Sequence, residues 1–177
     1  SGQFSEALRR FEQALSHVSQ ADSGHAWVHL QIGVGICHRE LATQAAGPAA
    51  NPHSALAISA FREALAVQTN VRRLKLTAEY LDLEDGNVVD LEGGNVLNLE
   101  GRKVWVLRGR RGPPLPLWDW AMTQENLGLA LYDHAKHSEG PEAAQCLGEA
   151  LAAFREALKV YTREQFPQEW ACAQNSL

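Results

Sequence analysis

The sequence ALAAFREALKVY, residues 150–161, shows most directly which kind of fold the chain adopts. Its key residues, Ala150, Phe154 and Ala157, follow one another at steps of three and four. Apolar residues at this spacing form a single stripe along an amphipathic helix. The small alanines let a neighbouring helix approach, and the phenylalanine ring fills the space between the two helices. The stretch therefore predicts a helix that packs along its length against others.

The same phrase, Ala-xxx-Phe-xx-Ala, occurs in EALRRFEQAL at 6–15 and in LAISAFREAL at 56–65. A second phrase, Trp-xxx-Gln-xx-(Leu or Val)-Gly, alternates with it at 27–35 and 120–128, and begins again at Trp170. A Gly-Pro pair, suited to ending one helix and starting the next, follows each complete copy, at 47–48 and 140–141. The sequence thus alternates two kinds of helix.

The spacing of the copies defines a repeat. Ala7 and Ala57 lie 50 residues apart, whereas Trp27 and Trp120 lie 93 apart, so one junction holds 43 additional residues, at about 70–112. Each unit is a pair of antiparallel helices that must stack on its neighbours to bury its apolar face. The first helices of the paired units are predicted to begin near Ala26 and Leu117. The second helices should include Phe61 and Phe154.

The Leu-Gly pair followed by Ala-xxx-Phe-xx-Ala resembles the tetratricopeptide repeat. The words WAMTQENLGLAL at 120–131 and AFREALKVY at 153–161 resemble the bacterial and kinesin-light-chain-like arrays of that superfamily. The resemblance covers 3–69 and 113–177, and it implies a mainly α solenoid of antiparallel helix pairs. The unit of 50 residues exceeds the usual ~34, so the helices or their loops should be longer.

The additional segment contains an octad repeated three times from residue 83 to 106: LEDGNVVD, LEGGNVLN and LEGRKVWV. Asp-Gly and Gly-Gly suit two-residue hairpin turns, and six residues between turns make a strand of ordinary length. We therefore predict a small β-meander inserted between two helical repeats, with turns at 85–86, 93–94 and 101–102. Its strands are expected at 74–84, 87–92, 95–100 and 103–109. The alternative is a duplicated, flexible loop, which costs little at such a junction. The expected domains are helical repeats at 1–69, the β-meander at 70–112 and further helical repeats at 113–177.

Basic residues stand at both ends of the insertion. In a four-stranded meander the first and last residues emerge at the same end, so these side chains should meet and offer a site for an anion or an acidic peptide. The alternative is a solvated collar of charge. The residues are Arg72, Arg73, Lys75, Arg108, Arg110 and Arg111.

Composition excludes several classes of function. A formal net charge of −5 argues against a nucleic-acid binder. No apolar run reaches the ~18 to 20 residues that span a bilayer. Three widely spaced cysteines, Cys37, Cys146 and Cys172, indicate buried, reduced thiols and a cytoplasmic protein. Because the chain lacks an initial Met, we expect it to be a fragment or a processed chain.

Chemical motifs are sparse. His25 and His29 lie four apart on one helix face, and His134 and His137 lie three apart, but no third ligand stands at metal spacing and no Cys-xx-Cys occurs. We therefore expect no metal site, only solvated histidines. Neither a phosphate-binding loop nor a nucleophile elbow is present, so we expect no cofactor and no enzymatic activity. The periodic tryptophans at 27, 120 and 170 are expected in the core between repeats, not in a ligand cage.

The function that the resemblance implies is that of a protein–protein interaction scaffold, which binds a partner peptide or helix on the concave face. That face is lined by the first helix of each pair. Its alternatives are a regulatory or substrate-recruiting part of a larger enzyme, and recognition through the inserted β-meander and its basic collar. The alternative for each single residue is an exposed side chain without a partner. The residues expected to contact the partner are His29, Ile32, Ile36, Arg39, Met122, Glu125, Asn126, Leu129, Tyr132, Asp133 and Asn175.

Overall fold

A computed structural model of the chain describes residues 2–20, 24–45, 50–80, 89–91, 94–99, 102–107 and 115–177. Side chains are described for 2–20, 24–45, 50–69 and 117–177. These parts are mainly helical, as predicted, and contain six helices: α1 (Gly2–Leu15), α2 (Gly24–Gln44), α3 (Ala50–Tyr80), α4 (Leu115–Ala135), α5 (Gly140–Leu158) and α6 (Pro167–Asn175). The second and fourth helices begin two residues before the predicted starts, within the usual uncertainty of helix ends.

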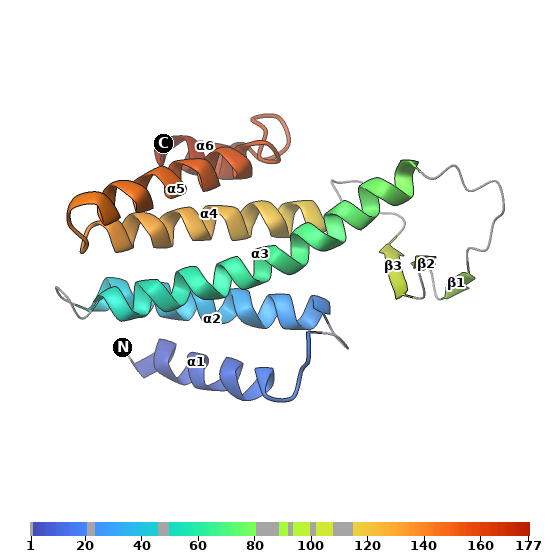
Figure 1. Cartoon of the computed structure of the whole chain (residues 1–177), viewed down its shortest axis with the longest axis horizontal. Coiled ribbons are helices and arrows are strands. Elements are labelled where there is room, and N and C mark those ends of the chain that lie inside the picture. Colours follow the sequence, from blue (N-terminus) through green and yellow to red (C-terminus); the bar gives the residue numbers. More distant parts are fainter. Residues whose placement is uncertain are drawn as a thin grey trace.

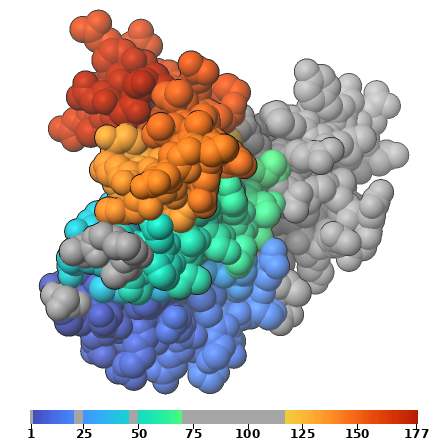
Figure 2. Space-filling view, turned by 60° about the vertical axis from the view of Figure 1, so that its left-hand side comes forward, coloured from blue at the N-terminus to red at the C-terminus, as the bar shows by residue number. Residues whose placement is uncertain are grey.

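The helices follow one another in space in the order of the chain. Each helix packs against the next one, and α2 also contacts α4. Successive helices run in opposite directions, with α1 at the bottom of Figure 1 and α6 at the top. The colour therefore changes from blue to red up the stack in Figure 2. This arrangement is compatible with a helical repeat.

The core consists of the residues that the repeated phrases place on the helix stripes. Ala57, Phe61 and Ala64 in α3 are buried, and so are their counterparts 93 residues later in α5. Trp120 is buried in the same cluster, while Trp27 and Trp170 pack against its edge, as expected of core tryptophans. The first helix carries no buried residue because it lies at the end of the stack and packs on α2.

The Gly-Pro pair at 140–141 opens α5, as predicted, but it does not close α4, which already ends at Ala135. Gly140 has φ +60°, a left-handed conformation that suits glycine, and Pro141 occupies the first turn. A proline also opens α6, at Pro167. The first Gly-Pro pair, at 47–48, lies outside the described residues. The start of α5 is therefore set by backbone conformation, since Glu139 before it makes no side-chain cap.

Between α3 and α4, the described backbone forms three short antiparallel strands in the order β1-β2-β3: β1 (Val89–Leu91), β2 (Gly94–Leu99) and β3 (Arg102–Leu107). Leu91 pairs with Gly94, and Leu99 pairs with Arg102. Gly94 and Arg102, predicted as turn residues, thus begin strands. The four-stranded meander is not shown: α3 continues as a helix through 74–80, where the first strand was expected, and 81–88 lie outside the described residues.

The predicted boundary at residue 70 falls inside α3, and the helix runs eleven residues beyond it, to Tyr80. Residues 70–80 include arginine, leucine, lysine, alanine and glutamate, which are good helix formers. Within the part of the chain described, no helix combines the length and apolarity needed to cross a bilayer.

Candidate functional site

A stripe of half-buried residues runs along α4 between its two neighbouring first helices. Its members, Met122, Glu125, Asn126 and Leu129, follow one another at helical steps, so they share one face. All were predicted to contact a partner. Met122 and Leu129 also pack in part against the core cluster, and each of the four residues keeps part of its surface accessible. We call these four residues the α4 stripe.

The side of the stripe toward α2 is defined by a hydrogen bond between helices. Arg39 Nη1 in α2 donates to Asn126 Oδ1 at 2.9 Å, and Arg39 Nη2 donates to Glu40 at 3.0 Å. Asn126 Nδ2 in turn donates to the main-chain oxygen of Met122 at 2.9 Å. Each end of the amide retains capacity for one further hydrogen bond, because an Asn has two N–H donors and two oxygen lone pairs. Arg39 and Asn126 therefore fix α2 against α4 and can still bind a ligand.

The side toward α6 is acidic. Burial raises the pKa of Glu125, and the nearby carboxylate of Glu169 in α6 raises it further. The hydroxyl of Tyr161 and the charge of Arg39 act in the opposite direction, but they do not reverse the shift. Burial and Glu125 likewise raise the pKa of Tyr161. The carboxylate of Glu125 is thus poorly compensated by its own protein.

The other residues predicted to contact a partner are distributed unevenly. Ile32 is only 4% exposed and belongs to the core cluster, so its assignment to the binding face is wrong. Tyr132 is 47% exposed beneath Lys136, whose Nζ lies 4.2 Å from the ring centroid and pairs with Asp133 at 2.8 Å. Ile36 is half-buried and packs on the core, whereas His29 and Asn175 are exposed.

The predicted anion patch cannot be assembled from the described side chains. Arg72, Arg73 and Lys75 lie in the helical backbone of α3 and not in a strand. Arg108, Arg110 and Arg111 lie outside the described residues. Whether the two clusters meet stays a prediction.

A hollow lies on the side formed by α3 and α5, and no sequence pattern indicated it. This cavity has a volume of about 280 Å³. An ion pair between Arg62 and Glu149 joins its two helices. Only the fold brings these positions together, since their helices are separated by the whole insertion. The lining residues are Ala55, Ile58, Arg62, Leu131, His134, Glu142, Gln145, Cys146 and Glu149.

Beside this cavity, Ser54, His134 and Glu142 are arranged in the order of a catalytic triad. Ser54 Oγ lies 2.8 Å from His134 Nδ1, and His134 Nε2 lies 3.5 Å from Glu142 Oε1. However, Ser54 donates its only hydroxyl proton to the carbonyl of Asn51 at 3.0 Å, so His134 must donate to Ser54. Ser54 is also only 1% exposed. The geometry is that of a structural network that ties α3 to α4, not of an activated nucleophile.

The cysteines differ in exposure. All three thiols are free, with Cys37 buried, Cys146 half-buried and Cys172 exposed. Burial raises the pKa of Cys37 and of Cys146, which lowers the thiolate fraction at neutral pH. The expectation that all three are buried is therefore wrong for Cys172. Cys172, within α6, is the exposed thiol of the three.

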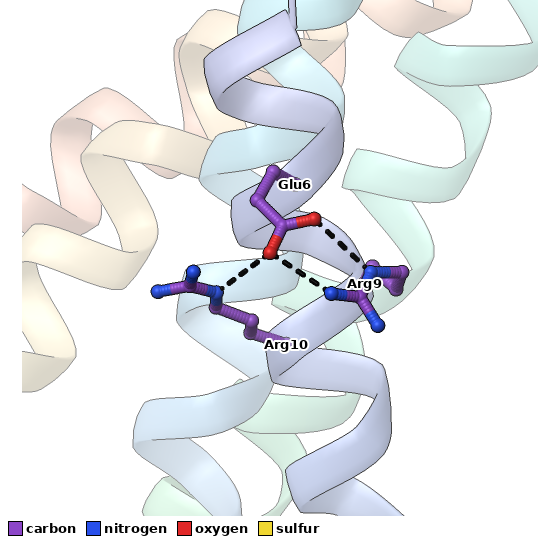
Figure 3. Close-up of polar contacts among 3 residues, drawn as sticks. All are labelled: Glu6, Arg9 and Arg10. Atoms are coloured by element: carbon purple, nitrogen blue, oxygen red, sulfur yellow. Dashed lines mark hydrogen bonds and ion pairs between the residues drawn. The ribbon is translucent and has the colours of Figure 1, made fainter.

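On α1, Glu6 accepts hydrogen bonds from two arginines of the same helix (Figure 3). Arg9 binds both carboxylate oxygens, at 2.9 and 3.1 Å, and Arg10 Nε binds one of them at 2.9 Å. These two arginines lower the pKa of Glu6 to about 2. Because these side chains are in contact with solvent, such pairs contribute little to stability. This cluster is a solvated helix surface.

The fold places a third side chain, from α4, beside the histidine pair at the start of α2. The spacing of residues in the sequence could not predict this contact. Asp119 of α4 places its carboxylate 3.6 Å from His29 Nε2, and His25 Nε2 lies 3.1 Å from the same nitrogen. The expectation of no metal site rested on a missing third ligand, and the fold supplies one.

No protein-family model matches this chain, and the comparisons with curated proteins and with solved structures also give no match. The tetratricopeptide resemblance therefore rests on the repeated phrases alone, and the described helices are compatible with a helical repeat.

Proposed function

We propose that this protein is an interaction module that binds an extended or helical segment of a partner protein along the α4 stripe, between α2 and α6. The observation that carries the proposal is the α4 stripe. Its four residues, spaced at helical steps, are all half-buried, with Arg39 on one side and Glu169 on the other. In the same proposal the helices form a tetratricopeptide-like solenoid. The strands β1–β3 belong to a small accessory insertion.

The chemistry of the stripe suits a peptide. Met122 and Leu129 supply adaptable apolar contact, and the free half of the Asn126 amide can pair with a peptide backbone. Between them stands Glu125, whose ionisation is disfavoured by burial and by Glu169. A Lys or Arg of the partner would neutralise the charge of this carboxylate, which the protein's own residues leave poorly compensated. We therefore propose that the bound segment carries a basic residue flanked by apolar ones.

Selection from a displayed random peptide library on the immobilised protein tests this function. The selected peptides should share a basic residue, and their binding should weaken by about tenfold or more in Glu125→Lys, because an attraction between unlike charges becomes a repulsion between like charges. Leu129→Asp should also weaken binding, since it introduces a charge into the apolar part of the stripe.

The matched control is Glu12→Lys, which makes the same change of charge at an exposed position of α1. This variant should bind the selected peptides as the unmodified protein does. Helical circular dichroism of all variants must be unchanged for the comparison to count. Equal loss in Glu12→Lys and Glu125→Lys, or a selection without enriched peptides, would refute the proposed site.

A further inference from the structure

Three potential metal ligands converge where the first turns of α2 and α4 meet. His25 and His29 lie four residues apart on α2, with their Nε2 atoms 3.1 Å apart and their rings at 84° to each other. Asp119 reaches the same point from α4, with Oδ2 3.6 Å from His29 Nε2. All three ligand atoms lie within 4.8 Å of one another. We propose that this cluster is a binding site for a divalent transition-metal ion such as Zn²⁺.

The distances fit one ion bound to all three side chains. A zinc ion holds His nitrogen and carboxylate oxygen at about 2.0 to 2.2 Å, so two ligand atoms on a tetrahedral ion lie about 3.3 to 3.5 Å apart. The separations of 3.1 and 3.6 Å stand on either side of this value. Only small side-chain rotations are needed to place all three atoms around one centre.

The way the ligands are held also favours binding. Two histidines at positions i and i+4 of a helix present their rings on one face, as in helical zinc motifs. Asp119 is only 8% exposed, so its carboxylate is restrained and partly desolvated before any ion arrives. In contrast, the two histidines are exposed and leave one side of the cluster open to solvent. The site thus offers three protein ligands and an open fourth position, which water or another donor can fill.

Without an ion, a hydrogen bond between the two imidazoles requires one Nε2 to donate and the other to accept. A bound cation replaces this constraint, because both nitrogens then present lone pairs and the carboxylate meets a positive charge. Imidazole and carboxylate together suit zinc, cobalt and nickel rather than calcium, which prefers oxygen ligands alone.

The protein holds a second histidine pair that serves as an internal comparison. His38 Nδ1 and His53 Nδ1 lie 3.0 Å apart, at a similar separation to the first pair. Among the described residues, however, the only group of three ligands is the one formed by His25, His29 and Asp119. If two close histidines were sufficient, both pairs would bind; if the carboxylate decides, only the first pair binds.

The test is titration of the metal-free protein with Co²⁺ and Zn²⁺. Calorimetry should give one equivalent of Zn²⁺, and Co²⁺ should show the visible absorption of a site of low coordination number, which Zn²⁺ then displaces. His25→Gln, His29→Gln and Asp119→Asn should each weaken Zn²⁺ binding by at least about tenfold, because loss even of groups outside the ligand shell costs that much.

The control variants are His53→Gln, which breaks the second pair, and His17→Gln, which removes an exposed histidine after α1. Both should bind Zn²⁺ as the unmodified protein does. Circular dichroism of each metal-free variant establishes that its helices are intact. Absence of stoichiometric binding, retention of binding in Asp119→Asn, or equal loss in His53→Gln would overturn the proposal.

Discussion

Gly128 in α4 lies directly against the ring of Phe154 in α5, so that a Cβ at this glycine would stand 2.7 Å from Phe154 Cε1. Gly35 in α2 has the same relation to Phe61 in α3, with 2.6 Å to the corresponding ring atom. The two glycines are 93 residues apart, and so are the two phenylalanines. Each helix pair is therefore closed by the same contact, in which the missing side chain of one helix receives the ring of the other.

This contact makes Gly128→Ala destabilising, although alanine favours helices. Phe154 is only 2% exposed, so its ring cannot move aside without displacing other core atoms. We expect the free energy of unfolding to fall by about 1 to 3 kcal/mol, the usual cost of an overpacked core. Urea or thermal unfolding followed by circular dichroism measures it.

Gly148→Ala is the matched control, because Gly148 also lies inside a helix but a Cβ there meets nothing within 4 Å. Alanine should then show only its helix preference and raise the free energy of unfolding by about 0.5 to 1 kcal/mol. If Gly128→Ala and Gly148→Ala shift stability in the same direction, the contact with Phe154 is not the reason for a glycine at position 128.

The repeated phrases predicted this part of the fold well because they specify helix and packing together. Ala-xxx-Phe-xx-Ala marks both the buried stripe and the ring that fills the glycine gap, so α3 and α5 followed from a few residues. The helical extension of α3 through 74–80 did not follow. Extending the octad period backward predicts a strand at 74–80, but these residues favour a helix equally well. Local pattern alone does not choose between strand and helix.

The candidate sites were harder to predict than the helices. Ile32 shares its repeat position with Glu125, but Ile32 belongs to the core, whereas Glu125 is half-buried near Glu169. His29 and Asp119 lie 90 positions apart, and no spacing in the sequence joins them. Such contacts depend on how two helices of different repeats align, which a pattern within one helix does not contain.

Stability should depend on pH through His38. Burial lowers the pKa of this histidine below its ordinary 6.5, and neighbouring His53 lowers it further, while Glu12 opposes the shift. Near and below pH 6.5 the unfolded chain therefore takes up a proton more readily than the folded one, so protonation favours unfolding. The contribution of His38 to stability is present above pH 6.5 and is lost as the pH falls toward its folded pKa.

Melting temperatures at pH 7.5, 6.5 and 5.5 should fall more steeply for the unmodified protein than for His38→Gln. His17→Gln, at an exposed position, should retain the steep dependence and so controls for the loss of one histidine. An unchanged slope in His38→Gln would exclude this residue as the cause.

Glu125 should lower stability at neutral pH. Burial and Glu169 raise the pKa of this carboxyl above its ordinary 4.5, so the unfolded chain loses the proton first as the pH rises. Between pH 4.5 and the folded pKa stability declines, and the penalty persists at pH 7. Glu125→Gln removes the charge while its amide oxygen can still accept from Tyr161. Its melting temperature should exceed that of the unmodified protein at pH 7 and match it near pH 4.

Glu164→Gln removes a carboxylate from an exposed position, and its melting temperature should differ little from that of the unmodified protein at either pH. A Glu125→Gln variant that is no more stable at pH 7 would mean that its neighbours compensate the charge. The proposed need for a basic partner residue would then lose its physical basis.

Removing 70–112 should leave the helical part folded. The core cluster, among residues with described side chains, is built from 27–67 and 118–173. After the deletion Leu117 would follow Leu65 by nine positions, as Pro167 follows Leu158 at the end of α5. The shortened junction thus matches one that the protein already forms without an insertion. The deletion loses the end of α3, which extends past this junction to Tyr80.

We expect the deleted protein to be soluble, to keep the helical signal of the remaining residues in circular dichroism, and to lose only a small part of its stability. A control that keeps α3 and replaces 81–112 by a Gly/Ser linker of equal length separates the effect of the helix end from that of the strands. An unfolded or insoluble deletion would show that residues 70–112 contribute to the core. A deletion that folds but no longer binds the selected peptides would move the recognition surface from the α4 stripe to the octad segment.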